Sequence, residues 1–467
     1  MEPASKPLTQ SSSDRAPPIP ALGRRRPRPA PPFARLPVRP VRCTGRRPVR
    51  GAARIWVAVS WLFLALSFLA TAALVSTAAA RVRVPYTTAL VIVGLAAGAL
   101  HVVPAVSIGP EFIVVGLIVP LLFEGAVRIP RRPLRAYAPL IFALAVPGTL
   151  LAAAIIAAAA AVGAGVPWAA ALVLGAVCAA TDPAGVIALV RESRLDERLG
   201  TILEGEAAVN DAVAIVLFTL AAAAAPLGAG WACGAGLTCA VAAFVWLLVG
   251  GAAAGAVAGA AVAYALSGVT DPVVEAIGSL VAAAASYAAA EAIRASGVIG
   301  VVAAGITFAG LAARGLTPAG LEIVEAVWDV IAFLANSALF LLVGLVVPWS
   351  LLTRHAGLIA VVVVAALAAR AMGVYGFTAW LARPASPVPP AWRHVLVWSG
   401  LRGGVAVALV LALPPALPYR DAVAAGILGL VIWTLIGQGL LVEPLMRWTG
   451  LRTTGRPSAA PDAAGRP

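Results

Sequence analysis

The stretches ATDPAGVIAL (residues 180–189) and EGEAAVNDAVAIVLF (residues 204–218) place two aspartates, Asp182 and Asp211, inside otherwise apolar sequence. Both stretches belong to runs that are long enough to approach or cross a bilayer. A carboxylate in such a run costs several kcal/mol unless it is neutralised, paired or placed in a wet cavity. Two of them in one chain therefore indicate an ion or proton pathway through a membrane.

The composition indicates a multi-pass membrane protein. Of the 467 residues, 61% are hydrophobic and only 12% are charged. Apolar runs recur along the chain at roughly the 17–25 residues that a helix needs to cross the hydrocarbon layer. These runs do not alternate as β-barrel strands do, so we expect an all-α protein with about thirteen transmembrane helices. The predicted helices cover residues 55–79, 85–103, 111–128, 136–163, 167–190, 204–225, 236–266, 272–293, 296–312, 321–347, 356–381, 392–413 and 422–446.

The two ends of the chain have a different composition from these runs. Residues 1–54 carry 13 of the 34 Lys and Arg residues and are rich in proline, so we expect a disordered basic tail near anionic lipid headgroups. Nucleic-acid binding is not expected, because Phe33 is the one aromatic residue among the basic ones and no RNA-binding motif is present. Residues 447–467 are expected to form a short polar tail. The scattered cysteines and histidines predict neither a cofactor nor a resident metal site.

Positive charges in the connections predict the orientation in a cell membrane. Alternate connections carry fifteen arginines, and the opposite connections carry only three. The positive-inside rule places the arginine-rich connections and the C-terminus in the cytoplasm. Thirteen helices would then put the basic tail outside, which the same rule disfavours. A misassigned start, a first segment that does not span, or a tail too long to obey the rule would each reconcile the two.

Two predicted helices are interrupted in the middle. The fifth contains Thr181-Asp182-Pro183-Ala184-Gly185, where the proline removes a backbone donor, and the twelfth contains Gly400-Leu401-Arg402-Gly403-Gly404. Each break lies in the middle helix of a triplet, helices four to six and eleven to thirteen. Because the breaks fall in the fifth and twelfth helices, the two triplets have opposite orientations. Inverted repeats with crossed discontinuous helices are typical of secondary transporters.

Polar residues gather near the first break. Glu204 and Asp211 are seven positions apart, so they share one face of a helix at a separation of roughly 10 Å. Asn210 could hydrogen-bond to a neighbouring unwound backbone. Thr181 and Asp182 lie where unwinding frees carbonyl groups, and carboxylate and carbonyl oxygens suit hard cations. Two close carboxylates in low dielectric can hold a cation or protons but resist holding both, and this competition is the basis of antiport.

Two arginines lie inside apolar helices and need partners. Glu204 is our first candidate for a structural ion pair with Arg370, and Arg402 is expected to balance the broken twelfth helix. Glu124 is equally compatible with a site ligand and with a residue near a helix end. Three further acidic residues are expected to form local pairs or to pack at helix ends: Glu275, Glu291 and Asp329.

Ordered motifs resemble the sodium/proton exchanger family, in the NhaP-like branch of the monovalent cation:proton antiporters. The resemblance runs from about residue 85 to 445 and leaves the N-terminal tail outside. A lone Thr-Asp-Pro would be weak evidence, whereas several motifs in the same order argue against chance. Besides the two opening stretches, the matching segments are PLLFEGA (120–126), SGVIGVVAAGI (296–306), VIAFLANSALFLLVGL (330–345) and WSGLRGGVAVALVLALP (398–414).

The resemblance implies a homodimer in which a core domain moves vertically to carry a monovalent cation and protons across the bilayer. It implies three parts within a transmembrane domain of residues 55–446: core helices at 136–225 and 356–446, dimerisation helices at 55–128 and 272–347, and a linking helix at 236–266.

The resemblance also assigns roles by motif. It makes Asp211 the essential ion-binding carboxylate, supported by Asp182, Asn210 and Thr181. The Asn-Asp pair, in place of Asp-Asp, is similar to the electroneutral one-for-one branch. Many relatives carry a hydroxyl residue where this chain has Ala207, so the preference among Na⁺, Li⁺ and K⁺ stays open.

Three functions are compatible with two membrane aspartates. The first is Na⁺/H⁺ antiport at Asp211 and Asp182, and K⁺/H⁺ antiport on the same scaffold is its close alternative. An intramembrane aspartic hydrolase would also use two aspartates, but it would be expected to carry a Gly-x-Gly-Asp motif, and here Asn210 precedes the second aspartate. A sensor or scaffold would need a folded soluble domain that neither tail can build. We therefore expect a transporter and not an enzyme.

Overall fold

The computed structural model describes residues 67–79, 81, 86–100, 112–129, 131–182, 196–224, 236–346, 349–381 and 388–449. Within these ranges all regular structure is helical, as the sequence predicts. The predicted tail 1–54 and the chain beyond residue 449 lie outside the described residues.

The α-helices are α2 (Tyr86–Ala99), α3 (Val119–Val127), α4 (Arg131–Ala145), α5 (Pro147–Ala158), α6 (Trp168–Ala179), α8 (Glu197–Ala224), α9 (Leu237–Ala265), α10 (Pro272–Ala292), α11 (Gly297–Gly315), α12 (Pro318–Val346), α13 (Trp349–Arg354), α14 (Ala356–Trp380), α15 (Pro390–Trp398), α16 (Gly404–Leu411), α17 (Arg420–Trp433) and α18 (Gly439–Trp448).

Many of these helices are long and apolar enough to cross a bilayer. Among the described residues, seven meet that criterion by length and composition. Shorter apolar helices accompany them, including α6 and a helix over Ser67–Ala79. The chain is therefore a multi-pass membrane protein, whereas the count of thirteen spans stays a prediction.

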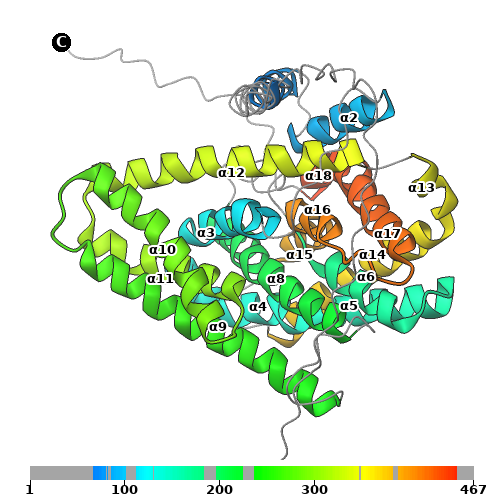
Figure 1. The fold of residues 1–467 in the computed structure, drawn as a ribbon, viewed down its shortest axis with the longest axis horizontal. Coiled ribbons are helices and arrows are strands. Elements are labelled where there is room, and N and C mark those ends of the chain that lie inside the picture. Colours follow the sequence, from blue (N-terminus) through cyan, green and yellow to red (C-terminus); the bar gives the residue numbers. More distant parts are fainter. Residues whose placement is uncertain are drawn as a thin grey trace, which may run out of the picture. The chain divides into compact units, whose positions relative to one another are not determined.

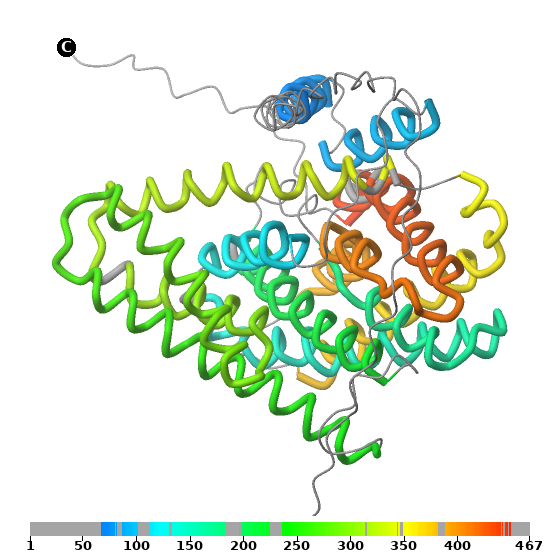
Figure 2. The backbone as a smooth tube through the Cα atoms, viewed as in Figure 1, coloured from blue at the N-terminus to red at the C-terminus, as the bar shows by residue number. Residues whose placement is uncertain are grey.

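The contacts between helices define two groups. In the first group α9, α10 and α11 pack side by side, and α12 packs on α2, α3 and α10 (Figure 1). In the second group α5 packs on α6, and both contact the pair formed by α14 and α17. Figure 2 shows that the helices α4, α5, α6 and α8 lie next to α14, α16 and α17, although α9–α13 intervene in the sequence. α8 contacts helices of both groups, so it joins them.

The predicted break in the twelfth helix is confirmed. α15 ends at Trp398, α16 begins at Gly404, and the five residues between them are not helical. The fifth helix also ends early, because α6 stops at Ala179 and Ala180 has extended backbone (φ −57°, ψ 138°). The rest of that predicted break, from Pro183 onward, lies outside the described residues.

Glycines hold α9 against α11. A Cβ atom added at Gly251 would lie 2.6 Å from the carbonyl oxygen of Ser296, and one at Gly259 would lie 2.7 Å from that of Ala304. At Gly255 an added Cβ would overlap the backbone of Gly300. Glycine at every fourth position therefore lets the two helix backbones touch, as small residues do in membrane helix pairs.

We predict that Gly255→Val lowers the thermal stability of the protein in detergent by several degrees. A side chain at this position must push two backbones apart, and overpacking of this kind costs about 1–3 kcal/mol. The measurement is the melting midpoint followed by fluorescence-detected size-exclusion chromatography. Gly376→Val is the matched control, because Gly376 is exposed on α14 and has open space at its Cβ. Equal midpoints for the two variants would contradict the packing described here.

Candidate ion-binding site

The two breaks meet and are joined by their backbones. The N–H of Asp182 donates a hydrogen bond to the carbonyl oxygen of Leu401 at 2.8 Å. The approach requires glycine at position 403, because a Cβ atom there would overlap the Asp182 carboxylate. Asp182 therefore lies where the two interrupted segments cross.

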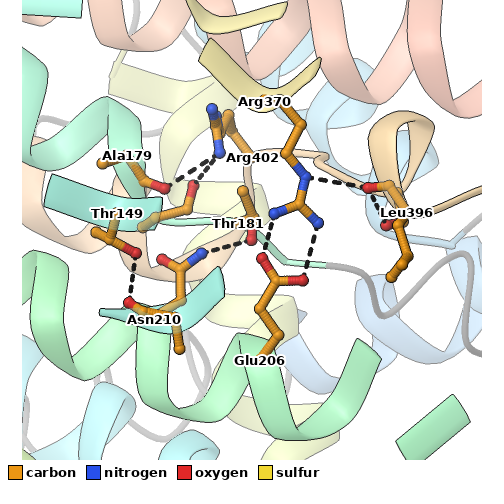
Figure 3. A network of polar contacts seen from close by, with 11 residues as sticks. Thr149, Ala179, Thr181, Glu206, Asn210, Arg370, Leu396 and Arg402 are labelled. Atoms are coloured by element: carbon orange, nitrogen blue, oxygen red, sulfur yellow. Dashed lines mark hydrogen bonds and ion pairs between the residues drawn. The ribbon is translucent and has the colours of Figure 1, made fainter. Parts of the chain in front are cut away.

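Arg402 completes the end of α6. Its Nη1 donates to the carbonyl oxygens of Ala180 at 2.8 Å and Ala179 at 3.3 Å (Figure 3). Its backbone N–H donates to the hydroxyl of Thr434 at 3.0 Å, in the π-helical turn Thr434–Gln438. The last carbonyls of a helix have no partner within the helix, and a cation there also interacts favourably with the helix dipole. Arg402 is 2% exposed, so the break contains a buried positive charge, as the sequence predicts.

α8 contributes the adjacent polar residues Asn210 and Asp211 to the crossing. The Nδ2 of Asn210 donates a hydrogen bond to the hydroxyl of Thr181 at 2.8 Å, which joins α8 to the first break (Figure 3). The oxygen of the same amide, Oδ1, is buried and has no hydrogen-bond partner among the described residues, and the same is true of the Oδ1 of Asp211. Both oxygens are suited to bind a cation, and the Asp211 carboxylate can also take up a proton.

Asp182 and Asp211 line the same cavity. Its volume is about 530 Å³, and its walls come from α2, α3, α8, α12 and α16 together with the first break. Glu124 and Glu204 also line this cavity. The three carboxylates predicted as ion ligands therefore surround one space, together with Glu204, which the sequence assigns to a pair with Arg370. Ala207 lies in its wall and supplies no hydroxyl there. The polar residues of the wall are Tyr86, Glu124, Arg128, Asp182, Glu204, Asp211, Asp329 and Asn336.

The cavity lies between the two helix groups. α2, α3 and α12 belong to the first group, whereas α8 and the crossing pack with the second. Across the described ranges, no cluster of three or more His, Cys, Asp or Glu side chains could hold a resident metal ion.

Comparisons with known proteins identify the family of this chain. The family profile described as "Sodium/hydrogen exchanger, transmembrane" matches residues 66–448. The chain belongs to this exchanger family. It is 34% identical over 372 residues to the Na⁺/H⁺ antiporter ApNhaP of Aphanothece halophytica, a match that covers 79% of this chain and 70% of the relative.

A second relative and a solved structure extend the comparison. The chain is 30% identical over 399 residues to the Na⁺/H⁺ antiporter NhaH of Halobacillus dabanensis, covering 83% of this chain and 97% of that protein. The sodium proton antiporter MjNhaP1 from Methanocaldococcus jannaschii, solved at pH 8, superimposes with a TM-score of 0.70 at 18% identity. This match covers 85% of this exchanger and 99% of the other chain, so the two share the fold.

The partner predicted for Arg370 is wrong. Both terminal nitrogens of Arg370 bind the carboxylate of Glu206, and its Nε donates to the carbonyl oxygen of Leu396 at 3.0 Å (Figure 3). Glu204 instead lines the cavity. The reason is the helical period: two positions along α8 rotate a side chain by about 200°, to the opposite face. Glu206 is four positions before Asn210 and so shares its face, a signal that the sequence contained.

The other acidic residues differ in their roles. Glu275 accepts hydrogen bonds from the N–H and hydroxyl of Thr317, before α12, and Glu291 accepts from the N–H of Gly297 at the start of α11. Both therefore bind at helix ends, as predicted. Asp329 does not, because it pairs with Arg128 of another helix at the cavity wall.

We predict strong energetic coupling between Glu206 and Arg370. Their side chains are 2% and 11% exposed, and removing one partner of a buried pair costs about 3–5 kcal/mol because the other charge is left alone. We compare the decrease in melting midpoint in detergent for Glu206→Gln, for Arg370→Gln and for the double variant. Each single variant should cause more than half of the decrease that the double variant causes, because the two effects are not additive.

The matched control for this cycle is Glu204→Gln combined with Arg370→Gln. The two effects should add, because Glu204 faces the cavity. Coupling of Arg370 to Glu204 and not to Glu206 would show that the pair assigned here is incorrect.

Proposed function

We propose that this protein is a monovalent cation:proton antiporter that exchanges Na⁺ for H⁺, with Asp211 and Asp182 as the groups that both ions occupy. The observation that carries the proposal is that these two carboxylates line one cavity beside the crossing of two broken helices. The relatives named above as Na⁺/H⁺ antiporters support Na⁺ as the cation.

The chemistry follows from competition for the same oxygens. Ionised Asp182 and Asp211 attract a small cation, and carboxylate oxygens are the ligands that such hard cations prefer. Protonation of the pair removes this attraction. Because the site resists holding a cation and protons together, a conformational change that carries one ion in each direction exchanges them.

Neighbouring residues would support this site in three ways. Asn210 and Thr181 bind each other and hold α8 against the break, which leaves the Oδ1 of Asn210 as an acceptor. Glu124 adds a carboxylate to the cavity wall. Arg402 fixes the end of α6 next to Asp182. Asn in place of a second adjacent aspartate leaves one carboxylate at this point of α8, in keeping with electroneutral exchange.

The absence of a hydroxyl at Ala207 bears on selectivity. An alanine in the cavity wall supplies no oxygen, so a water molecule would complete the coordination of a bound cation. A partly hydrated site discriminates less by size than a site made only of protein oxygens. K⁺ and Li⁺ are therefore the competitors to compare with Na⁺.

The setting of this activity is also a proposal. The arginine-rich connections support a plasma-membrane protein with its C-terminus in the cytoplasm. Arg128 lies in one of these connections, so in this orientation its end of the cavity would face the cytoplasm. The antiporter would work as a homodimer.

We predict that Asp211→Asn abolishes exchange. The amide keeps the shape of the side chain but can neither carry the negative charge nor take up a proton. The measurement is the recovery of a pH-sensitive dye when Na⁺, Li⁺ or K⁺ is added to acid-loaded everted vesicles, between about pH 6 and 9.

The control for this test is Glu322→Gln, which makes the same chemical change at an exposed position of α12. It should leave exchange intact. Cation-dependent proton efflux that persists in Asp211→Asn would refute the role of Asp211. If the unmodified protein exchanges none of the three cations, the proposed function itself fails.

A further inference from the structure

An ion-paired cluster lies in the cavity wall apart from the two aspartates. It consists of Glu124 on α3, Arg128 at the end of α3, and Asp329 on α12. The Nε of Arg128 lies 2.7 Å from Oε1 of Glu124, and its Nη2 pairs with the carboxylate of Asp329. All three residues line the cavity that contains Asp182 and Asp211.

The charges of the described wall are unequal. Five carboxylates face the cavity, whereas Arg128 is the one basic side chain among the described residues that line it. An acidic cavity with low-dielectric walls concentrates cations from solution. A guanidinium stays charged at every physiological pH, so Arg128 opposes this effect at all times. It behaves as a permanently bound cation that cannot be transported.

The packing of α3 on α12 does not require this cluster. Phe123 and Trp328, the residues directly before Glu124 and Asp329, place their ring centroids 4.6 Å apart. Both aromatic side chains are buried. In contrast, 22% of the Arg128 side chain and 58% of the Asp329 side chain are exposed. Exposed ion pairs contribute little to stability, so the aromatic contact holds the helices and the ion pairs are free to serve another purpose.

We propose that Arg128 is a built-in counter-ion that sets the apparent affinity of the cavity for the transported cation. The inference rests on the proposed antiport function. Arg128 pairs with Glu124 and Asp329, and its positive charge also acts on the cavity that Asp182 and Asp211 line. A cation that enters the cavity therefore meets a lower negative potential than the number of carboxylates would produce.

The test is the apparent KM for Na⁺ in everted vesicles that carry Arg128→Gln. Removal of one positive charge near the path should lower KM by about threefold to tenfold at low ionic strength, with a smaller change in maximal rate. The decrease should shrink when choline chloride is added, because salt screens charges in a wet cavity. Arg128→Lys retains the charge and should keep the KM of the unmodified protein.

Two further variants make the test specific. The double variant Glu124→Gln/Asp329→Asn retains Arg128 without its partners and should raise KM. Arg354→Gln, which removes an exposed arginine of α13 that does not belong to the described cavity wall, should leave KM unchanged. The melting midpoint of each variant is measured in parallel.

The outcomes separate the inference from the function. An unchanged KM in Arg128→Gln at every salt concentration, with exchange still present, would overturn the counter-ion role and leave the antiport function standing. A loss of maximal rate and stability at constant KM, not restored by lysine, would also overturn it and assign a structural role. Absence of exchange in the unmodified protein would reject the function instead.

Discussion

The hydrogen bond from the N–H of Asp182 to the carbonyl of Leu401 is the contact on which the site depends. A broken helix inside a membrane exposes backbone groups that water cannot reach, and each unpaired group costs several kcal/mol. Here each break supplies a partner for the other, so two local defects become one stable crossing. The same contact fixes the backbone of Asp182, and therefore the position from which its side chain projects. Glycine at position 403 leaves room for that side chain, so the backbone geometry and the chemistry of the site cannot be changed separately.

Two buried arginines, Arg402 and Arg370, add further contacts around this backbone hydrogen bond. Arg402 satisfies carbonyls that α6 leaves open, and Arg370 joins α14 to α8 through Glu206. Both arginines are held by protein groups outside the large cavity, whose described wall includes neither of them. As a result, two positive charges lie close to the crossing without occupying the space that a transported cation needs. Asp182 and Asp211 thus line the cavity, whereas the fixed charges of Arg370 and Arg402 lie outside its described wall.

The sequence predicted much of this arrangement because its strongest signals are local. Glycine, proline and isolated charges in apolar runs identify the breaks, and the seven-residue spacing of Glu204 and Asp211 places both on one face of α8. Pairing between distant helices was harder to foresee. Sequence alone favours Glu204 as the partner of Arg370 because both are charges in need of a partner, whereas the helical phase of α8 turns Glu206 toward Arg370. The contact between Arg128 and Asp329 joins positions 201 residues apart, and no spacing rule connects them.

The distribution of charges over the two helix groups links affinity to conformational change. Asp182 and Asp211 belong to elements that pack with the second group, whereas Glu124, Arg128 and Asp329 lie on α3 and α12 of the first. A displacement of one group against the other changes the distance between the Arg128 guanidinium and the two aspartates. Coulomb interactions depend on that distance, so the cation would be held with different strength before and after the displacement. A counter-ion on one helix group can thereby favour binding in one state and release in the other whenever the two groups move relative to each other, without any change in the ligands themselves.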